Sequence, residues 1–523
     1  MSQFRRRIKS LLYILLISFT NCAKLDNSLI LGAENVAETA GAEVQRGIMG
    51  EWGDPYDMRL IPIHSMLLPD GCVLGYGTSA TGKQRADLYY EIWDVGKGTH
   101  EEARMLLEHS TKADMFCSTL NMDISTGNIL IFGGDLRDDG KNLGSDNVLE
   151  LNYQTHEIQH HAVGKMNYQR WYATSINLPN GEILIVGGKA QDKTYIAIPE
   201  VWSATNGFRA LVDAEIPAIA GSTRKHWWYP HVYVSSRGAI FMIMPHGSNA
   251  DIYHLEVEGE GTIKKIGETP FKTHVLDPSI MYRPDKVLFL DQNGRLWTFD
   301  MSGNPLVFRK NKKIGQPRTN GFFSLLPDGR VAITGGCNTT ANLGNELSGA
   351  NYSIQIWNPD TDKVFDGGNQ QNPRLYHSTS LTLPDGTVVS AGGGAPGPVR
   401  NLNGQLYRPD YLFNENNKEA VRPVITRCPK NISTNQVFTI RVGSASQVER
   451  ITASKSGASS HARNRDARWV ELDFEVLDKV KIRVTVKNEN VMIPGLWTIN
   501  TLDKNGIPSK GCLLGVNTAK LEI

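Results

Sequence analysis

The chain has 523 residues, of which 40% are hydrophobic, so it is long enough for two domains with separate cores and disorder is excluded as its main state. Lys and Arg number 55 against 54 Asp and Glu, and the formal charge of +1 provides no basic field of the kind that nucleic-acid-binding proteins use. We therefore expect no nucleic-acid partner. The 50 Gly and 24 Pro cluster at turn-like sites, which favours many short strands.

Residues 1–22 are typical of an export signal peptide. Four basic residues between positions 5 and 9 precede an apolar run at 11–19 that is too short to span a bilayer as a mature helix. The last four residues, Phe-Thr-Asn-Cys, also fit a relaxed lipoprotein signal in which Cys22 carries lipid, with ordinary signal cleavage as the alternative. We expect a secreted, periplasmic or cell-surface protein, and the lipidated form would be tethered to a membrane through Cys22. Residues 23–45 are a polar linker.

A repeat organised around glycine runs through residues 46–418. Each copy has a turn, often Pro-Asp-Gly or Pro-Asn-Gly, then a β-branched run, and in most copies a glycine pair. The seven copies span residues 67–77, 125–134, 178–188, 235–244, 283–294, 325–336 and 382–394. Their number and spacing predict a seven-bladed kelch-type β-propeller, although the fourth and fifth copies lack the glycine pair.

The sequence pattern changes in residues 419–523. Alternating strands such as VFTIRV, KVKIRVTV and GLWTINTLD follow without glycine pairs. About 100 residues of this kind predict an immunoglobulin-like β-sandwich. The fold class is therefore all-β, a propeller followed by a sandwich, with Trp497 as a core residue.

Three of four candidate motifs for chemistry lie just before or at the start of a repeat's strand pair, a position that gathers around the axis of a propeller. They are Asp-Met-Phe-Cys ending at Cys117, Arg-Trp-Tyr ending at Tyr172, and Arg-Leu-Tyr-His with Tyr376 and His377. The fourth, His-Ala-Arg-Asn-Arg-Asp-Ala-Arg, begins at His461 in the C-terminal domain. Taken singly, each residue has a structural reading: a buried thiol, a hydrogen-bonded phenol or a core histidine.

Together these motifs resemble the galactose oxidase and glyoxal oxidase group of copper radical oxidases, in that family's order and over most of the chain. The resemblance implies that Cys117 and Tyr172 form a thioether-linked radical cofactor. It implies that Tyr376 is an axial tyrosine acting as base, and that His377 and His461 bind one copper ion together with Tyr172 and Tyr376. The implied activity is oxidation of a small aldehyde or primary alcohol, with O2 reduced to H2O2.

The residue types suit this chemistry. Two imidazoles and two phenol oxygens favour Cu(II), whereas zinc more often receives thiolates or a third imidazole. Removing two electrons from a substrate requires a second one-electron store beside copper, and a thioether-substituted tyrosine would supply it. Because adjacent strand residues point to opposite faces, Tyr376 and His377 can reach one ion only if the chain bends there. His461 must come from a loop of the sandwich that reaches into the channel.

Departures from the galactose oxidase pattern bear on the substrate. Lys189 and Ala190 follow the third glycine pair, where galactose oxidase has a tryptophan over the thioether ring, so Trp227 or Trp228 would have to shield it. The N-terminal carbohydrate-binding domain and a convincing sugar-binding arginine near residues 271–277 are missing. We therefore expect the glyoxal oxidase side of the group and not galactose as substrate.

Four cysteines remain once Cys22 and Cys117 are assigned. Cys428 and Cys512 lie near the first and last strands of the sandwich and could pair, while Cys72 and Cys337 could be buried thiols. We expect a monomer.

Two rival functions stay open. One is a non-catalytic propeller that binds glycans or proteins, and the other is a mononuclear copper or zinc hydrolytic site without a thioether.

Overall fold

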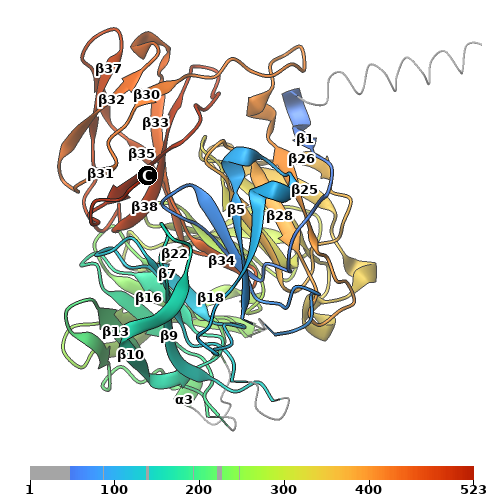
Figure 1. Cartoon of the computed structure of the whole chain (residues 1–523), viewed down its shortest axis with the longest axis vertical. Helices are drawn as coiled ribbons and strands as arrows, with labels where there is room; N and C mark the ends of the chain where they lie inside the picture. The colour runs from blue at the N-terminus through green and yellow to red at the C-terminus, as the bar shows by residue number, and fades with distance from the viewer. Residues whose placement is uncertain (1–46, 86–87, 137–140, 192–193, 221–225, 247) are drawn as a thin grey trace, which may run out of the picture.

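The computed structural model describes residues 47–85, 88–136, 141–191, 194–220, 226–246 and 248–523. The predicted signal at 1–22, with Cys22, and the linker at 23–45 lie outside the described residues. Within the described part of the chain nearly all regular structure is β-strand, and no helix there is long and apolar enough to cross a membrane. A ring of sheets carries a second β domain, coloured orange to red, on one side (Figure 1).

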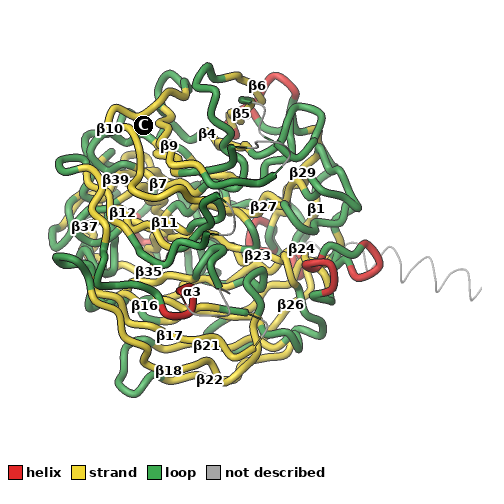
Figure 2. The backbone as a smooth tube through the Cα atoms, turned by 90° about the horizontal axis from the view of Figure 1, so that it is seen from below, coloured by secondary structure: helices red, strands yellow, loops and turns green. Residues whose placement is uncertain are grey.

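Seven antiparallel blades, each with four main strands, surround a central axis, as the repeat predicted; strands of the C-terminal domain join blades 1 and 5 into one larger sheet. Figure 2 shows inner strands such as β7, β11, β23 and β27 towards the centre and outer strands such as β6, β10, β22 and β26 at the rim. Blade 1 has β3 (His64–Leu67), β4 (Cys72–Tyr76), β5 (Tyr89–Asp94) and β6 (Arg104–Glu108); blade 2 has β7 (Thr119–Met122), β8 (Ile129–Phe132), β9 (Ser145–Leu151) and β10 (Ile158–Arg170); blade 3 has β11 (Thr174–Asn177), β12 (Ile183–Val186), β13 (Glu200–Ser203) and β14 (Gly207–Ala210); blade 4 has β15 (His231–Val234), β16 (Ile240–Met244), β17 (Ser248–Glu256) and β18 (Thr262–Thr273).

The remaining blades continue the ring, and the N-terminal strand completes the last one. Blade 5 has β19 (Ser279–Arg283), β20 (Lys286–Leu290), β21 (Arg295–Asp300) and β22 (Val307–Lys313); blade 6 has β23 (Thr319–Leu325), β24 (Val331–Cys337), β25 (Ser353–Asn358) and β26 (Lys363–Asn369); blade 7 has β27 (Ser378–Thr382), β28 (Val388–Gly392), β29 (Asn403–Arg408) and β1 (Glu51–Trp52). Strand β1 pairs with β29, and the short β2 (Tyr56–Asp57) pairs with it too, so the two ends of the propeller close on each other.

The glycine-rich copies correspond to the hairpins between the two innermost strands of the blades. Strand β12, from the third copy, is buried along its whole length and pairs with β11 from Thr174 opposite Val186 to Asn177 opposite Ile183. The fourth and fifth copies form equivalent hairpins, β15–β16 and β19–β20, without a glycine pair. Burial of the apolar run, which both kinds of copy share, is thus the common determinant of the hairpin.

The C-terminal domain is a sandwich of two sheets over its own core. One sheet has β30 (Ile425–Arg427), β32 (Val437–Val442), β37 (Lys481–Thr485) and β36 (Phe474–Val476); the other has β31 (Asn431–Ile432), β39 (Cys512–Val516), β38 (Gly495–Leu502), β33 (Arg450–Lys455) and β35 (Arg463–Leu472). Trp497 is fully buried in the core between them, as expected. Cys428 and Cys512 form a disulfide with a Cα–Cα distance of 6.5 Å.

Few described residues are helical. The short elements are α3 (Pro217–Ala220) and the 3-10 turns η1 (Val95–Lys97), η2 (Glu101–Ala103), η4 (Ala341–Gly344), η5 (Leu347–Gly349), η6 (Asp410–Leu412) and η7 (Ala445–Gln447).

One hairpin of the sandwich enters the propeller. Strand β34 (Ala458–Ser460) pairs with β3 of blade 1, and β35 pairs in parallel with β19 of blade 5. The Ser459 hydroxyl also donates to the Ser380 carbonyl of blade 7 at 2.8 Å. The expected loop at this place is therefore wrong in its detail: a paired β-hairpin, held by three blades, reaches into the channel.

Candidate metal and redox site

Three of the predicted residues occupy equivalent places in their blades. Cys117, Tyr172 and His377 lie one or two residues before the innermost strands β7, β11 and β27, and each has a left-handed backbone, with φ of +56°, +67° and +65°. Non-glycine residues adopt this conformation at a cost and mostly where the surrounding structure imposes it. We call these segments the entry turns, since each one leads the chain from the rim into a blade beside the axis.

Arginine side chains brace several entry turns. Arg170, Arg318 and Arg374 each donate through Nη1 to the carbonyl of a glycine in the blade that follows them in the chain, namely Gly187, Gly335 and Gly392 at 2.6, 3.1 and 3.0 Å. All three arginines are buried. The glycine pair of the repeat thus has a second role, because a buried glycine carbonyl accepts the hydrogen bond that fixes the entry turn.

Neighbouring entry turns are also joined through the backbone. The Tyr172 N–H donates to the Cys117 carbonyl at 3.0 Å, and the Tyr229 N–H donates to the Tyr172 carbonyl at 2.8 Å. Blades 2, 3 and 4 therefore hold these three residues in a row around the axis.

Tyr376 and His377 are adjacent in sequence but face the same site. The Ser378 N–H donates to the Leu375 carbonyl at 3.1 Å, which closes a turn, and the left-handed backbone of His377 lets its ring stack on Tyr376 with centroids 3.8 Å apart. The bend that the sequence required is present. His377 Nδ1 lies 3.0 and 2.8 Å from the carbonyls of Gly394 and Ala395, so it must carry the proton, and Nε2 keeps its lone pair.

His461 stands at the tip of the inserted hairpin. Ser460 pairs with Arg463 across a two-residue turn, and both turn residues, His461 and Ala462, have positive φ, at +47° and +65°. This is the backbone of a type I′ turn, which normally selects glycine or asparagine. Its occupation by histidine indicates that the tight turn serves to present the imidazole.

The five predicted residues come together in one buried cluster. The Cys117 sulfur lies 3.9 Å from His377 Nε2 and 3.7 Å from His461 Nε2, and the Tyr172 and Tyr376 hydroxyls are in contact. The Tyr172 ring centroid is 5.0 Å from that of His461. Each of the five side chains is at most 6% exposed.

Burial sets the protonation of the groups in this cluster. It lowers the pKa of His377 to about 3 and that of His461 well below its usual range, so both imidazoles are neutral near pH 7. Burial, with Cys117 next in importance, raises the pKa values of Tyr172 and Tyr376 well above the usual range of a phenol. Without a cation the hydroxyls therefore keep their protons.

The donor set fits a copper ion. Two imidazole nitrogens and two phenol oxygens converge, and Cys117 and the two histidines place one ligand atom each within 4.8 Å of one another. An N,O set of this kind suits Cu(II). A Cys117 thiolate without a thioether bond would, with both imidazoles, instead suit zinc, so the state of that sulfur distinguishes the two metals.

Sequence reasoning missed three neighbours of the site. Tyr229 follows Trp-Trp at the entry turn of blade 4, as Tyr172 follows Arg-Trp in blade 3, and its ring lies 4.9 Å from Tyr172 and 4.6 Å from His461. The Arg465 guanidinium is buried 4.0 Å above the Tyr229 ring. His64 stacks on Tyr76 and lies 5.7 Å from His461. The repetition of an aromatic pair ending in tyrosine was the signal that could have found Tyr229.

Trp227 and Trp228 lie where shielding of the Tyr172 ring was expected, but they do not stack on it. Both meet that ring edge-on, with centroids 6.1 and 5.9 Å away. Trp227 instead stacks between Tyr195 and Trp228, at 5.0 and 5.8 Å. An aromatic layer therefore stands beside the candidate cofactor, and Lys189 lies over Trp171 in the same region.

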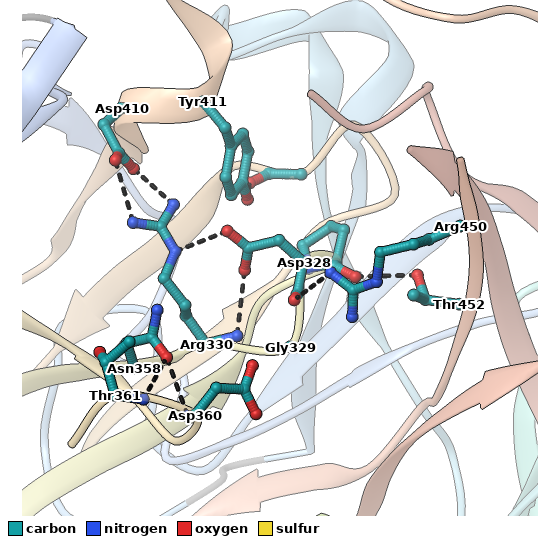
Figure 3. A network of polar contacts seen from close by, with 12 residues as sticks. Asp328, Gly329, Arg330, Asn358, Asp360, Thr361, Asp410, Tyr411, Arg450 and Thr452 are labelled. Atoms are coloured by element: carbon teal, nitrogen blue, oxygen red, sulfur yellow. Dashed lines mark hydrogen bonds and ion pairs between the residues drawn. The ribbon is translucent and has the colours of Figure 1, made fainter. Parts of the chain in front are cut away.

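A separate hollow at the junction of propeller and sandwich contains none of these residues. Its wall is a polar network in which Arg330 donates to both oxygens of Asp410, at 2.9 and 2.6 Å, and also to Asp328 (Figure 3). Arg450 of the sandwich donates to the Asp328 carbonyl at 3.3 Å. These charged groups are paired with one another, so the network joins the two domains.

The seven-bladed propeller, the inserted hairpin and the Cys-Tyr-Tyr-His-His cluster together resemble proteins of the galactose oxidase type. Residues 422–516 match the family model of the galactose oxidase-like early set domain. A galactose oxidase from Gibberella zeae is 24% identical over 519 residues, covering 91% of this chain and 72% of that protein. An aldehyde oxidase from Arabidopsis thaliana is 21% identical and covers 66% of this chain and 63% of that protein.

A solved structure gives the same fold. A fungal alcohol oxidase in complex with copper has a TM-score of 0.77 and 19% sequence identity, and the alignment covers 90% of this chain and 99% of that one. The chain is thus similar to the galactose oxidase and glyoxal oxidase group, and the predicted resemblance is confirmed. The match to galactose oxidase covers more of this chain than the match to the aldehyde oxidase does, so the expected leaning to the glyoxal oxidase side stays a prediction.

Proposed function

We propose that the chain is a copper radical oxidase that converts a small primary alcohol or aldehyde hydrate into the next oxidation level while reducing O2 to H2O2. The observation that carries the proposal is the convergence of Cys117, Tyr172, Tyr376, His377 and His461 from three entry turns and one inserted hairpin. A propeller that only binds glycans or proteins has no use for this set. The named relatives, a galactose oxidase and aldehyde oxidases, support the same class of reaction.

His377 and His461 would hold the ion through Nε2, with Tyr172 and Tyr376 as oxygen ligands. When bound, copper supplies a one-electron acceptor and a Lewis acid that orients the substrate oxygen. The left-handed turns and the hydrogen bonds to His377 Nδ1 fix these ligands before any ion arrives, which lowers the cost of assembling the site.

Tyr376 and Tyr172 divide the chemistry of the substrate. The Tyr376 oxygen, as phenolate, accepts the proton of the substrate hydroxyl. Tyr172, joined to Cys117 by a thioether and oxidised by one electron beforehand, accepts the hydrogen atom of the carbinol carbon. The alcohol loses two protons and two electrons in all: one proton goes to Tyr376, one hydrogen atom goes to Tyr172, and the remaining electron goes to copper when it is bound. O2 gains the same total as H2O2.

The surroundings of Tyr376 favour a small, weakly polar substrate. Its ring packs in a cluster with Val275, Leu276 and the partly exposed Trp228. These apolar neighbours of Tyr376 support the expectation of a small substrate other than galactose.

The same proposal includes export. The basic and apolar pattern of residues 1–22 and the Cys428–Cys512 disulfide are both typical of a protein that works in an oxidising compartment. Sequencing the mature N-terminus and measuring its mass would show cleavage near residue 22 and would reveal whether Cys22 carries lipid.

The decisive experiment has two readouts. After copper loading and chemical oxidation, a peroxidase-coupled assay over small aldehydes and primary alcohols should detect H2O2. Proteolysis should release the peptides of Cys117 and Tyr172 as one species that lacks two hydrogens. If protein fully loaded with copper releases no H2O2, the proposed oxidase activity is wrong. If the Cys117 and Tyr172 peptides separate, the hydrolytic zinc or copper site is favoured.

A further inference from the structure

Two turns of neighbouring blades meet on the face of the propeller opposite to the entry turns. Strand β3 begins at His64, near His461, and runs away from the axis site, so the hairpin turn at residues 68–71 and the start of β4 at Cys72 lie at the far end. The turn between β9 and β10, at residues 152–157, lies beside it. These turns bring Asp70 and Cys72 of blade 1 next to His156 of blade 2.

The three side chains offer one oxygen, one sulfur and one nitrogen to a common point. His156 Nε2 is 2.6 Å from Asp70 Oδ2, and all three ligand atoms lie within 4.8 Å of one another. Around a tetrahedral zinc with bonds of about 2.0–2.3 Å, ligand atoms are separated by roughly 3.3–3.8 Å. Side-chain movements of about 1 Å would therefore convert the observed cluster into a coordination shell.

Backbone contacts already orient these groups. The other oxygen of Asp70, Oδ1, accepts from the Cys72 N–H at 3.0 Å, which directs Oδ2 towards His156. The His156 carbonyl accepts from the Tyr90 hydroxyl at 2.7 Å, and its N–H donates to the Asn152 carbonyl at 2.8 Å. The ligands are held by both turns, and an ion between them would join blades 1 and 2.

Charge and access suit a divalent cation. A thiolate, a carboxylate and a neutral imidazole sum to two negative charges, which an ion of charge +2 neutralises. The nearby Lys97 is paired with Asp94 at 3.0 Å and does not fill the cluster. Cys72 is 8% exposed, whereas the His156 and Asp70 side chains are 18% and 23% exposed, so an ion can enter from solvent and keep a water molecule as its fourth ligand.

We propose that Asp70, Cys72 and His156 bind one divalent ion of the zinc class, separate from the copper site. Binding releases the thiol proton, as it does at other thiolate sites. The proposal stands independently of the oxidase activity, because no residue is shared between the two sites.

Co²⁺ is the probe that tests it, because a thiolate bound to Co²⁺ gives a charge-transfer band in the near ultraviolet. The test uses the full chain with Cys117→Ser, which removes the only cysteine of the axis site. This protein should show the band on addition of Co²⁺, and Zn²⁺ should abolish it. The double variant with Cys117→Ser and Cys72→Ser should lack the band. The matched double variant with Cys117→Ser and Cys337→Ser, which changes another buried thiol, should retain it.

Stoichiometry gives a second measurement that does not need the Cys117 variant. Native mass spectrometry of the wild-type chain equilibrated with Zn²⁺ should show one more bound ion than the His156→Ala protein. A band that persists without Cys72, the absence of a band in the folded Cys117→Ser protein, or equal ion counts with and without His156 would each overturn the proposal.

Discussion

The entry turns of blades 3 and 6 have the same architecture and different chemistry. In blade 3, Arg170 braces the turn and the left-handed residue is Tyr172; in blade 6, Arg318 braces the turn and the left-handed residue is Asn320, with φ of +65°. Tyr172 meets His461 and Tyr376 at the axis, whereas the Asn320 amide donates to the carbonyls of Leu343 and Gly344 at 2.7 and 3.0 Å. The fold therefore supplies the position, and the residue at that position decides whether it joins the candidate metal cluster or acts as a structural clamp.

The largest expected effect comes from a substitution that removes the thiol of Cys117 and leaves its entry turn intact. Cys117→Ser preserves the size of the side chain but cannot form a thioether, so oxidase turnover should fall by about 1000-fold or more while one copper ion still binds. Peroxide release and metal content measure the two quantities. Cys337→Ser, which changes a buried thiol of blade 6, should leave turnover unchanged, and wild-type turnover in Cys117→Ser would refute the radical mechanism.

Removing the brace should destabilise blade 3 more than blade 6. Arg170 donates to Glu200 at 2.8 Å, and both side chains are fully buried, so Arg170→Ala leaves an unpaired buried carboxylate and should cost about 3–5 kcal/mol. Arg318 donates only to neutral acceptors on Gly335, Ser353 and Gln355, and Arg318→Ala should cost about 1–3 kcal/mol. Denaturant unfolding of both variants measures the difference, and equal losses would contradict this account.

The junction of blades 5 and 6 should make stability depend on pH. Burial raises the pKa of Asp277 to about 7, although its carboxylate accepts from the His274 N–H and the Thr319 hydroxyl. In the unfolded chain this pKa is about 3.9. Between these values the folded protein holds the proton and the unfolded chain releases it, so stability falls as the pH rises from about 4 to 7, and the loss is complete above the folded pKa.

Asp277→Asn should remove that dependence. As the pH rises from 4 to 7, the free energy of unfolding of the wild type should fall, whereas that of the variant should not. The difference between them should therefore shift by about 2–4 kcal/mol in favour of the variant. Unfolding curves at several pH values measure it, and parallel profiles for the two proteins would show that Asp277 does not hold a proton in the folded state.

The smallest effect is expected at the structural clamp itself. Asn320→Ala removes two hydrogen bonds to the loop at residues 343–344 and leaves a side chain that disfavours left-handed backbone, so stability should fall by about 1–3 kcal/mol. Turnover should not change once the protein is folded. A large loss of turnover would show that blade 6 takes part in the chemistry.

Much of this architecture could be predicted from local patterns. The turn residues and buried apolar runs of the seven copies predict hairpins because each copy carries its own determinants, including the two copies without a glycine pair. The motifs ending at Cys117, Tyr172 and His377 were also placed correctly beside the axis, because they precede the innermost strands. The roles of the five residues remain a prediction.

What escaped the sequence depends on contacts between distant segments. The pairing of β34 with β3 and of β35 with β19 joins residues that are far apart in the chain, and nothing near His461 encodes those partners. The brace from Arg170 to Gly187 and the packing of Arg465 on Tyr229 are likewise properties of the assembled ring. The Trp227 and Trp228 pair was noticed, but its edge-on contact with Tyr172 follows from stacking on Tyr195, which composition does not reveal.

The inserted hairpin also has a consequence for biosynthesis. The ribosome synthesises the strands of all seven blades before residues 458–472. A nascent chain can therefore contain four of the five site residues and still lack His461. The candidate site is thus completed last, and a product truncated between residues 419 and 460 would contain the propeller strands but lack His461.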